Sequence, residues 1–113
     1  MKRKDIRKLD NEFRKMIRTG KPCMKCGNVK SQASHVIPVS TCGYGLRWNK
    51  KNAIPLCYRC HIHGWHKSPI DAMEWFRKKF GPMRILYLMK LKRESDQYKY
   101  ITPEEVRASW RDI

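Results

Sequence analysis

The sequence predicts a small α+β domain in which helices surround a short two-stranded centre held by a four-cysteine zinc site. Apolar residues recur at helical spacing near both ends of the chain. Two strand-like segments occupy the middle, and a Cys-x-x-Cys pair lies on either side of them. The 113 residues fit one domain. We divide it into a basic N-terminal helix (1–20), a zinc-knuckle core (21–67) and a helical C-terminal part (68–113).

The N-terminal helix is expected to be amphipathic. Its apolar face consists of Ile6, Leu9, Phe13, Met16 and Ile17. Asp5 is the expected N-cap, and Gly20 followed by Pro22 is a stop signal. The opposite face carries many Lys and Arg residues, so it is either a solvated surface or a surface that contacts phosphates.

The core is expected to contain two short strands. Residues 32–37 form the first, which Pro38 ends, and residues 53–56 form the second, whose Pro55 confines it to a sheet edge or bulge. The segment 39–51 between them contains Gly and Asn residues that favour an irregular loop.

Helices are expected to follow the second strand. One starts near Tyr58 and carries His61 inward. Another starts at Ser68, where a potential Ser cap precedes a proline, and ends at Gly81.

The last part of the chain is expected to hold two more helices. Residues 82–91 form a broad apolar surface, which is either core or a partner interface. Residues 94–100 are polar and predict a loop, and Thr102 begins a capping box that opens the final helix.

Charge points to a polyanionic partner. Lys and Arg number 26 against 10 Asp and Glu, which gives a net charge of +16 at pH 7. Such an excess favours binding to nucleic acid through phosphate neutralisation. Residues 13–70 contain no Asp or Glu, which disfavours mechanisms that need paired carboxylates.

The N-terminal residues lack the apolar core of a signal peptide, and no apolar run approaches membrane-spanning length. We therefore expect an intracellular, cytoplasmic protein without a membrane partner. In a reducing compartment, paired cysteines are typical of metal sites.

Four cysteines predict a structural zinc site: Cys23, Cys26, Cys57 and Cys60. Each pair places two thiolates on one turn, and four thiolates complete a tetrahedral Zn²⁺ shell with no open position. Gly27 permits the tight turn of a knuckle. Two disulfides or free thiols are the alternatives. The fifth cysteine, Cys42, has no such partner and is expected to be a bystander thiol.

The order of motifs in the centre is specific. A Cys-x-x-Cys pair precedes Ser34-His35-Val-Ile-Pro, and Asn52-Ala-Ile-Pro-Leu-Cys-x-x-Cys-His61 follows. This order resembles the HNH endonucleases, also called His-Me finger or ββα-metal nucleases. The segment Leu-Arg47-Trp-x-x-x-Asn with a later His66-Lys-Ser-Pro is similar to the phage recombination nuclease (NinG-like) branch. The resemblance covers residues 23 to about 81 and implies a ββα-metal core in the chain, located in the host cytoplasm if a phage encodes it.

The resemblance implies three catalytic residues: His35, Asn52 and His61. His35 corresponds to the general base that takes a proton from the attacking water, a task that suits a neutral imidazole. Asn52 corresponds to the residue that braces the loop so that the base is oriented, or that lies near the metal. His61 corresponds to a ligand of a catalytic divalent cation. Mg²⁺ or Mn²⁺ is the first expectation, and Zn²⁺ or Ni²⁺ also fits imidazole ligands.

The chain departs from the family pattern at Ser34, where an Asp or His ligand is common. We expect another side chain to complete the metal shell. His66, five residues after His61, is preferred over His63, which would point away from His61 in a regular helix. The predicted ligand set of the catalytic metal is thus His61, His66 and Ser34.

The predicted function is a metal-dependent DNA endonuclease that hydrolyses phosphodiester bonds, by nicking or by structure-specific cleavage. Double-stranded or branched DNA is the expected partner, and the protein is either a monomer or a homodimer. Candidate DNA contacts are Arg47, Lys50, Lys51, Arg59 and Lys67. Two alternatives remain: a zinc-stabilised nucleic-acid-binding module that does not cleave, and a basic structural protein of a ribonucleoprotein.

Overall fold

Two short antiparallel strands, β1 (Gln32–His35) and β2 (Ala53–Leu56), lie at the centre of the computed structural model, which describes residues 1–111. The last residue of β1 pairs with the first residue of β2. The prediction of two short strands is confirmed. Pro55 is tolerated because both strands of a two-stranded sheet are edge strands.

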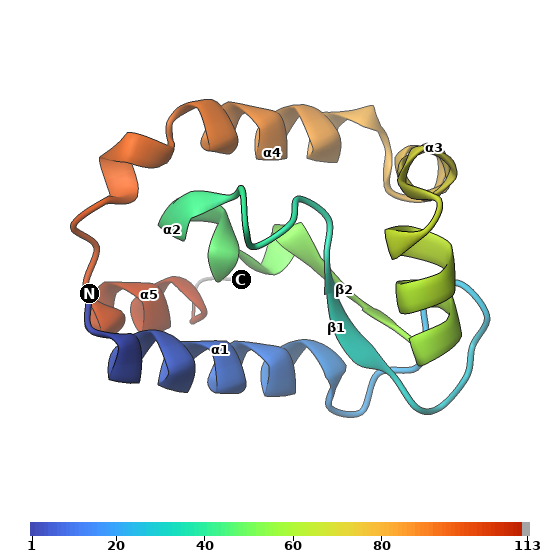
Figure 1. Cartoon of the computed structure of the whole chain (residues 1–113), viewed down its shortest axis with the longest axis horizontal. Helices are drawn as coiled ribbons and strands as arrows, with labels where there is room; N and C mark the ends of the chain where they lie inside the picture. The colour runs from blue at the N-terminus through green and yellow to red at the C-terminus, as the bar shows by residue number, and fades with distance from the viewer. Residues whose placement is uncertain (112–113) are drawn as a thin grey trace.

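Helices surround the two strands (Figure 1). The α-helices are α1 (Arg3–Arg18), α2 (Gly43–Arg47), α3 (Pro69–Phe80), α4 (Pro82–Arg93) and α5 (Pro103–Ser109). The other helical segments are the 3-10 turns η1 (Lys50–Asn52) and η3 (Ser95–Tyr98) and the π-helix η2 (Arg59–His66). Figure 1 shows α1 and α4 along opposite sides of the molecule, with α2 and the strands between them.

Helix α1 packs against both strands through its predicted apolar face. Leu9, Phe13 and Ile17 are buried there. The prediction that Asp5 caps the helix is wrong, because the N-cap position is Lys2. Asp5 instead lies in the first turn, where its carboxylate complements the positive end of the helix dipole.

The two faces of the strand pair contribute to two separate apolar cores, since side chains alternate along a strand. One core packs Ala53 against α1 and α5, and its buried members are Leu9, Phe13, Ile17, Trp48, Ala53 and Val106. The other lies towards α3 and α4, and its larger buried members are Leu46, Ile54, Leu56, Trp65, Phe76 and Leu88. The hairpin therefore has a packed layer on each face.

An ion pair fixes α2 to α1. The Arg47 guanidinium donates two hydrogen bonds to the Asp10 carboxylate, at 3.0 and 2.8 Å, and the Trp48 indole donates a third at 2.9 Å. Burial acts to raise the pKa of Asp10, but these hydrogen bonds outweigh it and hold that pKa below its usual value. The Arg47 side chain is thus occupied within the protein.

The prediction of an irregular loop over residues 39–51 is wrong, because α2 lies within this segment and η1 begins in it. Tertiary packing explains the difference. Gly43 adopts a φ of +52°, which favours glycine. A Cβ atom on Gly45 would lie 2.5 Å from the Tyr98 ring, so only glycine allows α2 to approach η3 this closely.

The C-terminal part is helical as predicted. Thr102 opens α5 with a complete capping box, whereas the Ser68 side chain makes no cap hydrogen bond at the start of α3. A 3-10 turn, η3, lies within the segment 94–100 that was predicted to be a loop. No helix in residues 1–111 is both long enough and apolar enough to cross a membrane.

Helix α4 divides the apolar surface predicted over residues 82–91 between core and solvent. Leu88 and Leu91 are buried. Met83, Leu86 and Met89 are exposed, at 73%, 54% and 45% of their maximal area. One side of the helix is therefore part of the core, as one of the two alternatives predicted, and the outer side is exposed.

Candidate functional site

Four cysteine side chains from two distant segments converge next to the hairpin. One pair follows α1, and the other lies at the junction of β2 and η2. The four Sγ atoms, of Cys23, Cys26, Cys57 and Cys60, all lie within 4.8 Å of one another. Within residues 1–111 this is the one group of three or more side chains that could hold a metal ion.

The sulfur geometry fits a zinc ion. The Sγ atoms of Cys26 and Cys57 are 3.6 Å apart. Two sulfurs bound at about 2.3 Å to one tetrahedral Zn²⁺ would lie about 3.8 Å apart. The first pair sits in a tight turn in which Gly27 has a φ of +79° and donates its N–H to the Cys23 carbonyl at 2.9 Å. The cluster therefore has the shape of a structural zinc site.

The protonation chemistry of the cluster also favours a cation. Burial acts to raise the pKa of the Cys23 thiol, but surrounding backbone N–H groups outweigh it and bring that pKa to about 6. Burial and the neighbouring thiols raise the pKa of Cys60 to about 12. One thiolate thus forms readily and opposes ionisation of its neighbours. Four thiolates so close together need a positive ion between them, which Zn²⁺ supplies.

His35 is held at the end of β1 by the backbone of α2. Its Nε2 lies 2.9 Å from the carbonyl oxygen of Arg47. A carbonyl only accepts hydrogen bonds, so Nε2 carries the hydrogen and Nδ1 is the nitrogen free to take a proton. Burial lowers the pKa of His35 below 6.5, which keeps the ring neutral near pH 7.

Asn52 holds together the two chain segments that flank His35. Its side chain is fully buried. The amide oxygen accepts the N–H of Ile37 at 2.8 Å, and the amide nitrogen donates to the carbonyls of Ile37 and Leu46 at 3.1 and 3.2 Å. Asn52 thus ties the loop after His35 to α2, which supplies the carbonyl that orients His35.

We expect Asn52→Ala to lower the free energy of unfolding by about 3 kcal/mol, because buried backbone groups of Ile37 and Leu46 would lose their partners. Urea denaturation measures this change. The matched control is Asn11→Ala on the exposed surface of α1, which should be neutral or slightly stabilising. Equal effects of the two substitutions would contradict the bracing role of Asn52.

His61 and His66 meet on one side of η2. Their Nε2 atoms are 3.0 Å apart. The pairing follows from the π-helical winding, because hydrogen bonding from i to i+5 brings residues five apart close together. In a regular α-helix the two side chains would point in different directions. The prediction that His66, not His63, accompanies His61 agrees with this geometry, since the His63 ring lies against Tyr58.

Gln32 sets the tautomer of His61. Its side-chain oxygen lies 2.9 Å from His61 Nδ1 and accepts that hydrogen, so Nε2 of His61 carries no hydrogen and accepts a hydrogen bond from Nε2 of His66 at 3.0 Å. Burial, together with the charges of His66 and His35, lowers the pKa of His61 to about 4. Both features keep His61 Nε2 available as a metal ligand at neutral pH.

The three histidines share one hollow, which we call the histidine cavity. It has a volume of about 720 Å³ and is lined by His35, His61, His66, Arg14, Trp65 and Met73, among others. Within the described part of the chain, none of its lining residues is acidic. The cavity therefore combines a neutral base, a pair of imidazole nitrogens and one guanidinium.

Comparison of the chain with protein-family models, curated proteins and solved structures finds no match. The local chemistry described above is therefore the basis for assigning a function.

Ser34 is not brought to the histidine cavity. It lies on the opposite face of β1 from His35, because neighbouring side chains alternate along a strand. Its side chain is fully buried, and its hydroxyl has no hydrogen-bond partner among the residues described. Ser34 therefore does not line the cavity in which it was predicted to bind the catalytic metal.

The five basic residues predicted to contact DNA differ in whether their side chains already contact other groups of the protein. Arg47 is paired with Asp10 through Nε and Nη2, so these two nitrogens are already engaged within the protein. Lys50 donates a hydrogen bond to the Trp110 carbonyl at 2.6 Å, and Lys51 lies 4.7 Å from the centre of the Tyr87 ring. Arg59 and Lys67 are exposed at the two ends of η2, the helix that contributes His61 and His66 to the histidine cavity.

Two functional candidates were missed from the sequence. Gln32 carries no motif signal, because its contact with His61 arises only when β1 and η2 come together. Arg14 was recognised only as part of a basic helix face, although it lines the histidine cavity. Its place in the cavity follows from the packing of α1 against β1, which also brings the ring centre of the neighbouring Phe13 to 5.7 Å from that of His35.

Proposed function

We propose that the protein is a metal-dependent DNA endonuclease that hydrolyses phosphodiester bonds at a single-metal site of the HNH type. The observation that carries the proposal is the meeting of His61 and His66, 3.0 Å apart, in the same cavity as a neutral His35. A strand pair followed by a histidine-bearing helix is also the arrangement implied by the resemblance to ββα-metal nucleases.

His35 acts as the general base. The Arg47 carbonyl and the Asn52 brace orient its ring, and Nδ1 accepts a proton from a water molecule as the water attacks phosphorus. The lowered pKa of His35 keeps the base unprotonated at neutral pH. Arg14, in the same cavity, holds the negatively charged phosphate group.

His61 and His66 are the residues that would hold the catalytic cation. Two nitrogens bound at about 2.1 Å to one ion lie about 3.0 Å apart when the angle between them is a right angle. Their Nε2 atoms have this separation. A pair of imidazoles without a carboxylate suits Mn²⁺, Ni²⁺ or Zn²⁺ better than Mg²⁺, which prefers oxygen ligands. The bound cation would stabilise negative charge on the phosphate and on the leaving oxygen.

DNA binding is supported by charge. The net charge is +16, and the segment that forms the histidine cavity contains no acid from residue 13 to 70. Arg59 and Lys67 are exposed at the ends of η2 and are available to contact phosphates. Contacts of this kind are largely independent of sequence, so we expect low base specificity and an affinity that falls steeply with salt.

Plasmid nicking with His66→Ala and His63→Ala tests the proposal. We expect His66→Ala to reduce the nicking rate by at least about tenfold and to raise the Mn²⁺ concentration needed, because one ligand is lost. His63→Ala is the matched control, since His63 is exposed on the same helix with its ring against Tyr58, and it should cut at the wild-type rate.

The same assay distinguishes the alternative of a non-cleaving, zinc-stabilised binding module. Wild-type protein should nick plasmid with at least one of Mn²⁺, Ni²⁺, Zn²⁺ and Mg²⁺. A wild-type protein that shifts the plasmid on a gel at low salt but cuts it with none of these metals would favour the binding module and exclude the nuclease.

A further inference from the structure

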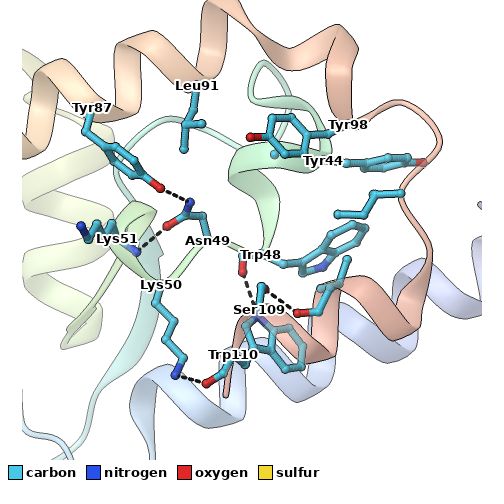
Figure 2. A pocket seen from close by; sticks show the side chains of 13 residues that line it. Tyr44, Trp48, Asn49, Lys50, Lys51, Tyr87, Leu91, Tyr98, Ser109 and Trp110 are labelled. Atoms are coloured by element: carbon cyan, nitrogen blue, oxygen red, sulfur yellow. Dashed lines mark hydrogen bonds between the residues drawn. The ribbon is translucent and has the colours of Figure 1, made fainter. Parts of the chain in front are cut away.

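A second hollow, separate from the histidine cavity, lies among α2, α4 and the C-terminal segment (Figure 2). It has a volume of about 340 Å³. We call it the aromatic cleft, because five of its lining residues are aromatic: Tyr44, Trp48, Tyr87, Tyr98 and Trp110. None of these residues lines the histidine cavity.

The rim of the aromatic cleft is basic. Lys50 and Lys51 both line it, and no acidic residue among residues 1–111 does. Figure 2 shows the two lysines on the side of the cleft occupied by Asn49. The Asn49 amide accepts the N–H of Lys51 at 2.9 Å and donates to the Tyr87 hydroxyl at 3.2 Å, so it joins the lysine-bearing turn to α4.

Packing in the apolar cores explains why some of these aromatic residues are present, but not all of them. Trp48 is buried, and Tyr44 stacks on it with ring centres 5.2 Å apart. Tyr87, in contrast, is 38% exposed on α4 and belongs to neither apolar core. Its ring borders the cleft and lies 4.7 Å from the Lys51 ammonium group, and Lys50 lines the same cleft with its ammonium group hydrogen-bonded to the Trp110 carbonyl. An aromatic face with ammonium groups in the same cleft suits a flat, apolar ligand that carries a negative charge.

We propose that the aromatic cleft binds an unpaired nucleobase of a DNA strand, with the adjoining phosphates held by Lys50 and Lys51. Aromatic side chains stack on any base, and lysines contact phosphates without regard to sequence. The small volume admits one nucleotide and excludes a duplex. This inference rests on the proposed function and narrows its substrate to DNA with single-stranded or flipped bases.

Helix α2 connects the aromatic cleft to the catalytic residue. Tyr44 lies on this helix and Trp48 directly follows it, while the carbonyl of Arg47 accepts the hydrogen bond from His35. A DNA strand bound in the aromatic cleft therefore lies against the same short helix that orients His35, the proposed general base. This placement suits cleavage near a junction between paired and unpaired DNA.

Binding of a fluorescent strand tests the inference without any cleavage. The probe is a single strand of about ten nucleotides that contains 2-aminopurine, whose fluorescence falls when the base stacks on an aromatic ring. It is compared with the same strand in a duplex, using zinc-loaded protein without other divalent metal. We expect Tyr87→Leu to weaken single-strand binding about tenfold and to leave duplex binding unchanged.

Tyr100→Leu is the matched control, because Tyr100 is 86% exposed and does not line the cleft. It should bind both probes as wild type does. A second variant, Tyr44→Leu, should resemble Tyr87→Leu, and circular dichroism checks that each variant is folded. Equal loss of single-strand and duplex binding, or no loss in Tyr87→Leu, would overturn the inference.

The result of this binding test does not depend on whether the proposed nuclease function is correct. If the nuclease proposal fails, no DNA is cut, yet the preference for the single strand and its loss in Tyr87→Leu are still measured. If the aromatic cleft does not bind bases, Tyr87→Leu binds the single strand like wild type whether or not wild-type protein nicks plasmid.

Discussion

Cys57→Ala is expected to abolish zinc binding and to unfold the centre of the domain. Cys57 is buried at the end of β2, and its segment is tied to the first knuckle by the hydrogen bond from the Met24 N–H to the Pro55 carbonyl, at 2.9 Å. Structural zinc sites contribute on the order of 10 kcal/mol to folding, which is comparable to the whole stability of a small domain. Zinc content by mass spectrometry and thermal melting by circular dichroism measure the two effects.

Cys42→Ala is the matched control for this prediction. Cys42 is as deeply buried as Cys57 but lies outside the four-cysteine cluster. It should retain one zinc ion per chain and lose only about 1 kcal/mol of stability from the small cavity. Retention of zinc by Cys57→Ala, or titration showing disulfides in the native protein, would contradict the metal assignment.

His35→Ala is expected to reduce the rate of DNA nicking by about 10²- to 10⁴-fold, the usual contribution of a general base. DNA binding should persist, because the basic surface residues are unchanged. Single-turnover nicking and a gel-shift titration on the same preparations separate these two effects. A rate within a few-fold of wild type would show that His35 is not the base.

The pH dependence of the wild-type rate gives an independent check on His35. The base must be neutral to act, and burial lowers its pKa below 6.5. Activity should therefore fall only as the pH drops below about 6.5, through the lowered pKa, and should be level above it. A rate that keeps rising from pH 7 to 9 would indicate that a different group limits the reaction.

Local sequence signals were sufficient for the elements whose formation depends on neighbouring residues. The apolar face of α1, the two short strands and the Thr102 capping box are all present, although β1 ends at His35 and not, as predicted, at Ile37. The four cysteines come together as the Cys-x-x-Cys spacing predicted. Local signals failed for α2, because its close approach to η3 depends on Gly45 facing Tyr98, a residue remote in the sequence.

The candidate active site depended more strongly on tertiary contacts. Its histidines were identified from their order in the chain. The orientation of His35, however, depends on the backbone of α2, and that of His61 depends on Gln32 in β1. The pairing of Arg47 with Asp10 likewise depends on the tertiary structure, because only the folding of α1 onto α2 brings the two side chains within 2.8 Å.

The sequence alone determined the kinds of chemistry that this protein can carry: a four-thiolate metal site, imidazoles near a basic surface, and no carboxylate in the central region. Ligand type and charge are properties of residues, so they can be counted along the chain. Only the tertiary structure decided which groups meet. The π-helical winding of η2 places His66 beside His61, and the alternation of β1 turns Ser34 away from His35, because side-chain direction is a property of the folded backbone.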